Sequence, residues 1–295
     1  MKLVTFAVDS CRRVGALMGD AIVDLREARG LQLLSMGATM EEAHERACSE
    51  VPDSMVRFIE GGERTLSVAR ECEEFAMRNR DLDSSVLSMK DVKVLTPIPE
   101  PLMILNMGNA YRPMPLGGFT FKPVTGLIGP DEPILIPKEI SDFGACYEVE
   151  IGIVIGTRGR RIPCDRTAYD FVYGYTVYND VTDYGKQIVG KFDSKLHDTF
   201  CPVGPCLVTK DEIEDPYNLV KKAWINGQLA TERSTCEMLH TIPEFVSIPS
   251  QTLTLLPGTI VSTGAPDAGR IGPGDVVELE ITNIGKMRNP VIAER

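Results

Sequence analysis

The chain has 295 residues, of which 43% are hydrophobic and 25% charged, so it is long enough to bury a core of ordinary size. Its net charge of −11 argues against nucleic acid as a partner, because phosphate binding requires clustered lysine and arginine. No apolar run reaches the roughly 18 residues of a membrane span, and the early charge at Asp9 argues against an export signal.

The N-terminal part of the chain predicts a small α+β domain. Alternating apolar runs at 3–8 and 14–25, separated by glycine turns, favour short strands in a hairpin or meander. Further along, Thr39 and Glu42 have the spacing of a capping box, which satisfies free backbone N–H groups at the start of a helix. Apolar residues then recur at three- and four-residue intervals over 66–76, which indicates an amphipathic helix.

Prolines at 97, 99 and 101 interrupt this pattern, so we place a boundary there, with a small N-terminal domain over 1–96 and a larger domain over 97–295. The larger domain is predicted to be mostly β, because apolar runs alternate with glycine and proline turns. The apolar runs lie at 102–107, 149–155, 171–178, 219–225, 253–263 and 275–284, with short helical patterns at 165–172 and 235–247. The expected fold class is therefore mixed α/β, mostly β.

The most informative local pattern is a pair of glutamates, Glu148 and Glu150, at the start of an apolar run. Side chains two residues apart in a strand point to the same face, so the two carboxylates should lie side by side. Two like charges about 4 Å apart repel by about 4 kcal/mol at an effective dielectric constant of about 20. A buried pair therefore needs a cation or bound protons, and oxygen ligands favour Mg²⁺ or Mn²⁺. Alone, the pattern is more typical of a solvated strand face.

Other segments carry polar residues that fit the same kind of site. A second apolar run ends in a carboxylate, Asp180. Lys195 and His197 precede a loop rich in proline and glycine, and a later strand ends in a small-residue loop at Thr263 and Gly264. Together these segments make a site more plausible than the glutamate pair does by itself.

In this order and at these spacings, the segments resemble the fumarylacetoacetate hydrolase family. The resemblance also covers GDAIVDL at 19–25, the segment 121–134 and the closing segment 274–291, which is nearly the whole chain. It implies that the larger domain is a β-roll catalytic domain of the family type, preceded by a small N-terminal α+β domain. It also implies a homodimer.

The resemblance implies a set of site residues. Glu148, Glu150 and Asp180 match the metal ligands of the family, with Mg²⁺ or Mn²⁺ as the expected ion and Ca²⁺ as an alternative. The other matching positions are the catalytic Lys122 and Lys195 and the substrate-binding Gln187, Thr263 and Gly264. Members of the family act on small oxo-acids that chelate the metal, and a divalent ion stabilises the enolate left when a bond next to a carbonyl breaks.

Two features depart from the family pattern. Hydrolytic members carry a histidine and a glutamate that activate water on a lid, but the corresponding segment, 107–123, has neither residue and is shorter. We therefore expect no lid helix and an open site. The family often has an arginine four residues after the metal-binding aspartate, where this chain has Tyr184 in the substrate site. A neutral phenol cannot replace a guanidinium, so either the substrate is less anionic or another residue takes that role.

The chain has three histidines, and one of them is a candidate for catalysis. His44 is expected at the surface, and His240 is expected to pack. His197 lies between Lys195 and Asp198, and its ordinary pKa near 6.5 suits proton transfer around neutrality. A hydrogen-bonded structural role is the alternative for His197.

The sequence thus predicts a divalent-metal-dependent enzyme that hydrolyses a carbon–carbon bond in a small oxo- or dioxo-carboxylic acid, such as an acylpyruvate, through an enolate. Because the water-activating pair is absent, the alternatives are a decarboxylase, tautomerase or other lyase, or a paralogue that binds metal and ligand without turnover. The eight cysteines form no CxxC pair, which favours reduced, buried thiols and a cytoplasmic protein. The expected partner is a small oxo-acid, with no nucleic acid and no membrane.

Overall fold

The computed structural model describes residues 1–8, 11–79 and 84–295, so Asp9 lies outside the described residues. The fold is mixed α/β and mostly strand, as predicted. The strands are β1 (Lys2–Val8), β2 (Cys11–Met18), β3 (Ala21–Asp24), β4 (Val86–Ser88), β5 (Lys93–Val94), β6 (Ile104–Asn106), β7 (Thr120–Phe121), β8 (Leu127–Ile128), β9 (Ile134–Ile136), β10 (Ala145–Tyr147), β11 (Val149–Ile155), β12 (Val172–Asn179), β13 (Thr182–Asp183), β14 (Cys201–Thr209), β15 (Val220–Ile225), β16 (Gln228–Ser234), β17 (Ile260–Ser262), β18 (Gly269–Ile271), β19 (Val276–Ile281) and β20 (Gly285–Ala293).

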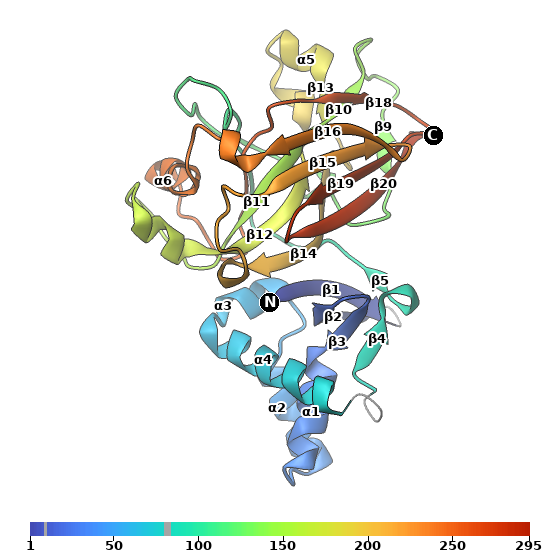
Figure 1. Cartoon of the computed structure of the whole chain (residues 1–295), viewed down its shortest axis with the longest axis vertical. Helices are drawn as coiled ribbons and strands as arrows, with labels where there is room; N and C mark the ends of the chain where they lie inside the picture. Colours follow the sequence, from blue (N-terminus) through green and yellow to red (C-terminus); the bar gives the residue numbers. More distant parts are fainter. Residues whose placement is uncertain (9–10, 80–83) are drawn as a thin grey trace.

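The helices are fewer and lie mainly in the N-terminal part, below the β-rich part in Figure 1. The α-helices are α1 (Leu25–Ser35), α2 (Met40–Glu50), α3 (Met55–Glu60), α4 (Glu63–Arg78), α5 (Tyr184–Ile188) and α6 (Ile242–Thr252). The 3₁₀ helices are η1 (Met89–Asp91), η2 (Val124–Gly126), η3 (Arg166–Phe171), η4 (Phe192–Lys195), η5 (Lys210–Glu212) and η6 (Thr235–Glu237). Among the described residues, none of the helices has both the length and the apolar character needed to cross a membrane.

The N-terminal elements follow from local sequence signals. β1, β2 and β3 form the predicted meander, with β2 paired to both neighbours. The predicted capping box begins α2, where Thr39 Oγ1 accepts from Glu42 N and the Glu42 side chain accepts from Thr39 N. The apolar stripe over 66–76 lies on the buried face of α4. These short-range predictions are confirmed.

A long sheet joins the N-terminal strands to the rest of the molecule. Its central order is β4-β3-β2-β1-β14-β12-β11-β17-β6-β7, in which β1 pairs antiparallel with β14. One hydrogen-bonded sheet therefore contains strands from both sides of the domain boundary that we placed at the proline-rich segment. The division into 1–96 and 97–295 stays a prediction.

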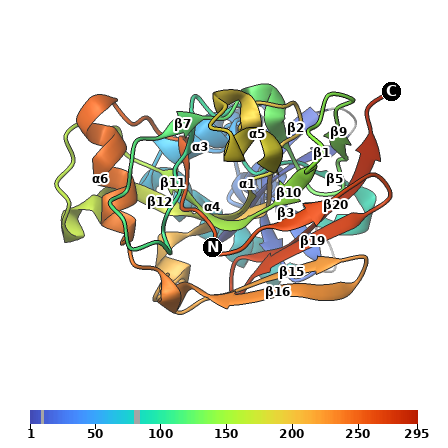
Figure 2. The ribbon, with the colours of Figure 1, turned by 90° about the horizontal axis from the view of Figure 1, so that it is seen from above.

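The core of the β-rich part lies between this sheet and a second sheet of order β16-β15-β19-β20-β9. Ile151 and Val177 from the first sheet and Ala223 and Leu279 from the second are buried in one apolar cluster. Figure 2 shows β15 and β16 along the lower edge and α6 at the left. Both β11 and β12 are buried along their whole length, so any polar side chain on them requires a partner.

The helix predicted at 235–247 begins later than expected, at Ile242. The segment contains two successive capping boxes. The first starts only the single turn of η6, and the second, formed by Thr241 and Glu244, starts α6. The single predicted helix therefore corresponds to two separate helices, η6 and α6. The pattern at 165–172 forms the 3₁₀ helix η3 rather than an α-helix.

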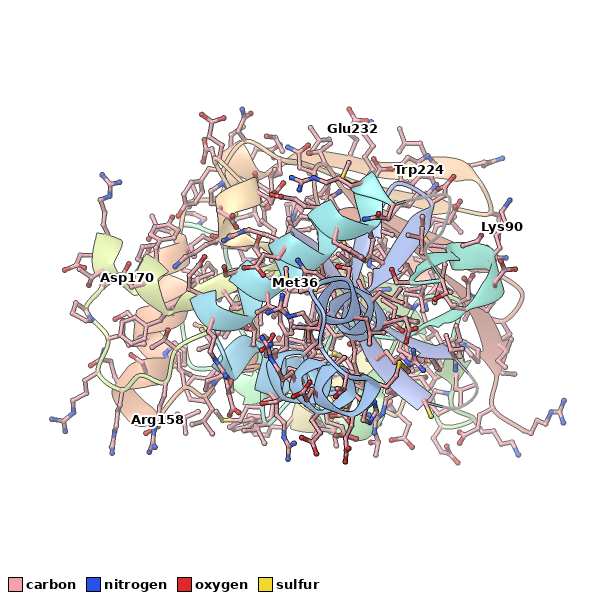
Figure 3. The ribbon with its side chains drawn as sticks, turned by 90° about the horizontal axis from the view of Figure 1, so that it is seen from below. Met36, Lys90, Arg158, Asp170, Trp224 and Glu232 are labelled. Carbon is pink, nitrogen blue, oxygen red and sulfur yellow. The ribbon has the colours of Figure 1, made fainter. Side chains whose placement is uncertain are left out.

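The surface carries the charge that the composition predicts. Seen from the N-terminal end, charged side chains such as Lys90, Arg158 and Glu232 point away from the ribbon (Figure 3). The cysteines are free thiols, but the prediction that they are buried is wrong for half of them. The buried ones are Cys72, Cys146, Cys201 and Cys206, while Cys11, Cys164 and Cys236 are exposed and Cys48 is intermediate.

Candidate metal centre

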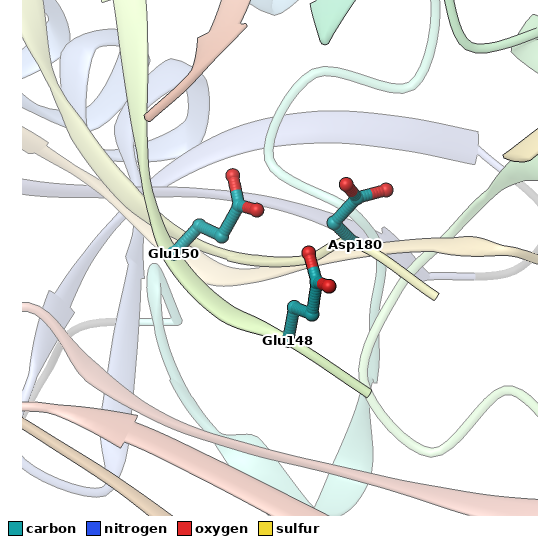
Figure 4. A group of neighbouring side chains, drawn as sticks. All are labelled: Glu148, Glu150 and Asp180. Carbon is teal, nitrogen blue, oxygen red and sulfur yellow. The ribbon is translucent and has the colours of Figure 1, made fainter. Parts of the chain in front are cut away.

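Antiparallel pairing of β11 with β12 brings three carboxylates together. Glu150 lies in β11 and Glu148 just before it, while Asp180 follows β12 and donates its N–H to the Glu148 carbonyl (3.1 Å). One carboxylate oxygen from each residue lies within 4.8 Å of the others. In Figure 4 the three side chains converge on one space from the two neighbouring strands. Their exposed fractions are 8% for Glu148, 0% for Glu150 and 1% for Asp180, so the solvated strand face is excluded.

Burial and mutual repulsion shift the pKa values of these groups in different directions. Burial, followed by the charges of Asp180 and Glu148, raises the pKa of Glu150 well above its ordinary value. Burial also raises the pKa of Glu148, although Lys195 opposes the shift. Burial alone would raise the pKa of Asp180, but Lys122 and Lys195 lower it to about 2. The positive charge in the site is therefore directed mainly at Asp180.

Two lysines supply that positive charge, of which Lys122 is buried and Lys195 is partly buried. The Lys122 ammonium lies 2.8 Å from Asp180 Oδ1 and donates to the carbonyls of Val181 (2.8 Å) and Phe200 (2.7 Å). Because its ammonium contacts these three oxygens, Lys122 links the Asp180 carboxylate to the backbone at Val181 and at Phe200. Lys195, at the end of η4, contacts Asp180 Oδ2 and lies 3.7 Å from Glu148 Oε2. Burial would lower the pKa of Lys195, but the carboxylates raise it, so the lysine stays charged.

Glu150 has no such cation. Its Oε2 accepts from Gly264 N (2.7 Å), and its Oε1 is buried without a hydrogen-bond partner among the described residues. Gly264 has φ +90°, and a Cβ there would lie 2.9 Å from Asn109 N, so this close approach requires glycine. An unpartnered buried oxygen beside two further carboxylates is a donor set that fits a hard divalent cation. The centre therefore has the chemistry of a divalent-metal site.

The other predicted site residues differ in whether they form hydrogen bonds with the three carboxylates. The Tyr184 hydroxyl donates to Glu148 Oε1 (2.9 Å), and its ring stacks on Phe143. Gln187 lies exposed on α5, and the Thr263 hydroxyl donates to the Ile151 carbonyl (3.2 Å). Within the described residues, neither Gln187 nor Thr263 forms a hydrogen bond with the three carboxylates.

His197 lies to one side of the centre. Its ring packs on Phe200, with centroids 4.8 Å apart, and its Nε2 is 3.4 Å from Lys186 Nζ. Burial and Lys186 lower the pKa of His197, so the imidazole is neutral at pH 7. In the part of the chain that the structure describes, its ring makes no hydrogen bond with the carboxylates.

The segment 107–123 runs past the centre and contains the short strand β7 but no helix. The expected open site stays a prediction. Ala110 N donates to the Thr263 carbonyl (3.2 Å), and the His240 ring lies 2.9 Å from the Met114 carbonyl. His240 also pairs with Glu244 (3.0 Å), so it anchors this segment to α6 through hydrogen bonds in addition to packing.

Sequence reasoning missed two residues that hold the backbone around the glutamates. Asn179 Oδ1 accepts from Glu148 N (3.1 Å), and Lys221 Nζ donates to the Val149 carbonyl (3.0 Å). The signal for Lys221 was available, since adjacent lysines at 221 and 222 within a strand must point to opposite faces, and one face is buried. The signal for Asn179 depended on strand register, which local sequence does not specify.

The comparisons with known proteins agree with this geometry. Residues 105–292 match the family model described as fumarylacetoacetate (FAA) hydrolase C-terminal. A mitochondrial oxaloacetate tautomerase of Xenopus laevis is 34% identical over 263 residues, which cover 82% of this chain and 79% of that protein. The oxaloacetate tautomerase YisK of Bacillus subtilis is 33% identical over 265 residues, which cover 82% and 87%.

Solved structures show the same fold. Maleylpyruvate hydrolase from Sphingobium sp. SYK-6, in complex with manganese(II) ion and pyruvate, aligns over 100% of both chains with a TM-score of 0.78 and 28% identity. A 2-hydroxyhepta-2,4-diene-1,7-dioate isomerase from Mycobacterium marinum aligns with a TM-score of 0.72 and 26% identity, covering 100% of this chain and 99% of the other. With a family match over more than half its length and the three carboxylates inside the matched region, the chain belongs to the fumarylacetoacetate hydrolase family.

Proposed function

We propose that the protein is a divalent-metal-dependent tautomerase that interconverts the keto and enol forms of a small oxo-dicarboxylic acid such as oxaloacetate. The observation that carries the proposal is a centre of three buried carboxylates, paired with Lys122 and Lys195, beside a segment, 107–123, that lacks the water-activating histidine and glutamate. Tautomerisation requires a stabilised enolate and a moved proton but no activated water. The relatives named oxaloacetate tautomerases support the same reaction.

Glu148, Glu150 and Asp180 would hold Mg²⁺ or Mn²⁺, and the manganese in the complex of maleylpyruvate hydrolase supports an ion of this class. When bound, a divalent ion supplies Lewis-acid stabilisation of the negative charge that develops on a substrate carbonyl oxygen. Lys122 keeps Asp180 ionised and in place, and Tyr184 orients Glu148 through its hydroxyl.

Lys195 and His197 take the remaining roles. Lys195 stays charged and is partly exposed at the edge of the carboxylates, so its ammonium is proposed to bind a carboxylate of the substrate. His197 is neutral at pH 7 and half-buried on the same segment, so it is the proposed proton carrier. Gln187, Thr263 and Gly264 are proposed to line the substrate site.

Hydrolysis of an acylpyruvate is the second candidate. The full-length structural similarity to maleylpyruvate hydrolase favours it. Under this proposal, water would have to be activated by a residue other than the missing pair, and His197 would be the imidazole available on the segment next to Lys195. Decarboxylation requires the same enolate stabilisation and stays a lesser alternative.

One experiment separates these reactions. Protein loaded with Mn²⁺ is incubated with oxaloacetate and with a set of acylpyruvates, the ultraviolet absorbance of the enol is followed, and the products are analysed. A tautomerase accelerates enol–keto exchange with no loss of carbon, a hydrolase releases two acids, and a decarboxylase releases carbon dioxide. Glu150→Gln protein is the matched control for uncatalysed exchange and for catalysis by free metal. Binding of Mn²⁺ without any conversion would favour the non-catalytic paralogue.

The remaining sequence-based expectations concern assembly and location. The homodimer stays a prediction, which light scattering of the purified chain would test. The cytoplasmic location also stays a prediction, because relatives with similar sequences are named as mitochondrial.

A further inference from the structure

Lys221 is a buried lysine that none of the proposed catalytic roles uses. It lies on β15, in the second sheet, and its exposed fraction is 1%. Its Nζ donates to the Val149 carbonyl (3.0 Å) and lies 4.2 Å from the centroid of the Tyr111 ring. Among the described residues, no carboxylate lies within ion-pair distance of this ammonium. Burial lowers the pKa of Lys221 to about 7, because the charged form is costly away from water, so the polar contacts that Lys221 does make are significant.

The Val149 carbonyl needs a partner because a strand ends beside it. The backbone groups of odd-numbered residues in β11 face β17, as the hydrogen bond from Ile155 N to Thr259 O (2.9 Å) demonstrates. Pairing with β17 covers only Gly152–Val154. The carbonyls of Val149 and Ile151 therefore point past the end of β17, where this strand offers them no backbone N–H donor.

Side chains replace the missing strand at both positions. Thr263 Oγ1 donates to the Ile151 carbonyl (3.2 Å), and Lys221 Nζ donates to the Val149 carbonyl. These two carbonyls flank Glu150, whose own Oε2 is held by Gly264 N. The three contacts together fix the backbone and the side chain of Glu150 from the side opposite Asp180 and its two lysines.

We propose that Lys221 is a positioning residue for the metal centre, which fixes the strand between Glu148 and Glu150 by binding the Val149 carbonyl under the cover of the Tyr111 ring. The inference rests on the proposed function of the carboxylates as metal ligands. Groups that orient the ligands of a metal from outside its coordination shell typically contribute about 10- to 100-fold to metal affinity.

A rival role for Lys221 predicts the opposite sign. Of the carboxylates, Glu150 has the largest effect on the pKa of Lys221 and opposes the effect of burial, so a charged Lys221 could serve as its counter-charge. In that case removing the charge would relieve repulsion of an incoming divalent ion, and metal affinity would rise. The sign of the change in affinity therefore distinguishes the two roles.

The test is Mn²⁺ affinity by titration calorimetry, together with the Tm of the protein with and without Mn²⁺. Lys221→Met has a similar length but neither donor nor charge, and its affinity should fall about 10- to 100-fold. Its metal-free Tm should stay close to that of the wild type, because removal of a buried amine offsets the loss of its hydrogen bond to the Val149 carbonyl. Lys221→Arg keeps a donor, a charge and stacking on Tyr111, and should restore most of the affinity. The matched control is Lys222→Met on the opposite face of β15, where Lys222 pairs with Glu232 on the surface.

Each outcome has one meaning. Unchanged or higher Mn²⁺ affinity in Lys221→Met overturns the positioning role, as does a loss of equal size in Lys222→Met. Failure of the wild-type protein to bind Mn²⁺ would instead overturn the proposed function. If Lys221→Met does not fold, Lys221→Gln decides in its place, because it lacks the charge and its amide lies one bond short of the carbonyl. It should then bind Mn²⁺ more weakly than the wild type.

Discussion

Two groups of charged side chains, one around the buried Arg29 and one at the three carboxylates, are built differently. In the N-terminal part, Arg29 joins three helices by pairing with Glu50 (2.5 Å) and Glu71 (2.9 Å). Arg46 also pairs with Glu50 (3.1 Å), so two arginines face two glutamates in this group. Burial opposes the shift, but Arg29 and Arg46 lower the pKa of Glu50, so the group is stable as an ionised cluster.

The carboxylate centre is not balanced in this way. Three carboxylates face two lysines, and both lysines act mainly on Asp180, so Glu150 is left with a backbone N–H and an unpartnered oxygen. A balanced cluster holds helices together, whereas an unbalanced one calls for a further cation. The comparison therefore predicts that mutations in the first group change stability and that mutations in the second change metal binding and turnover.

The largest expected effect is that of Glu150→Gln. Removal of one charged ligand should abolish the rise in Tm that Mn²⁺ produces, because stabilisation by a ligand depends on its affinity for the folded state. The metal-free Tm should stay the same or rise, since an unpaired buried carboxylate is lost. Calorimetry that finds unchanged Mn²⁺ affinity in this variant would break the assignment of Glu150 as a ligand.

Arg29→Met tests the balanced cluster. It leaves the partly buried Glu50 and the exposed Glu71 without their shared partner. Because water can solvate both glutamates, the loss of folding free energy should be about 1 kcal/mol rather than the larger cost of breaking a fully buried pair. Denaturant unfolding should report this loss, while Mn²⁺ affinity per folded molecule should match the wild type. A change in metal affinity without loss of stability would contradict the contrast between the two groups.

His197→Phe should act on turnover alone. General acid–base catalysis typically contributes about 100-fold or more, so kcat with the true substrate should fall by at least about that factor while Mn²⁺ affinity survives. His44→Phe, on the exposed face of α2, is the matched control. Wild-type turnover in His197→Phe would assign that histidine to packing on Phe200.

The smallest expected effect concerns pH in the metal-free protein. The folded pKa values of Glu148 and Glu150 lie above the ordinary 4.5, so the folded state binds protons that the unfolded state releases. Their contribution to the free energy of unfolding is greatest below pH 4.5 and is lost as pH rises through the folded values. Asp180 acts in the opposite direction, because its stabilisation is present above 3.8 and is lost as pH falls toward about 2.

Metal-free protein should therefore gain stability as pH falls from neutrality toward about 4.5, and then lose it in stronger acid. Saturating Mn²⁺ should remove the gain, since protons and metal compete for the same oxygens. Denaturant unfolding across pH, compared between the wild type and Glu150→Gln, isolates the contribution of Glu150. A gain of equal size in both proteins would place its origin elsewhere in the chain.

Local sequence signals were sufficient for much of the fold. The capping box at Thr39, the stripe on α4 and the apolar runs that became β11, β12 and β19 depend on spacing within one segment. The glutamate pair was also visible, because strand geometry fixes which side chains share a face. The family resemblance then added Asp180, which is distant in sequence from the glutamates.

The parts that could not be predicted depend on contacts between distant segments. The pairing of β1 with β14 and the hydrogen bond from Tyr184 to Glu148 both require register and packing that no single segment encodes. His197 illustrates the same limit, since proximity to Lys195 in sequence did not bring its ring into hydrogen-bond contact with the carboxylates. Neighbours along an irregular segment can point in different directions.

The junction of β1 with β14 has a practical consequence for recombinant work on this chain. β14 is buried along all of its length, and β1 covers one of its edges by pairing with Leu207 and Val208. A truncated protein that begins at residue 97 would lose this cover and present an open, apolar strand edge, which is a template for aggregation. Expression of the carboxylate-bearing half alone would therefore require a substitute strand, or a charged substitution on that edge, to prevent edge-to-edge association.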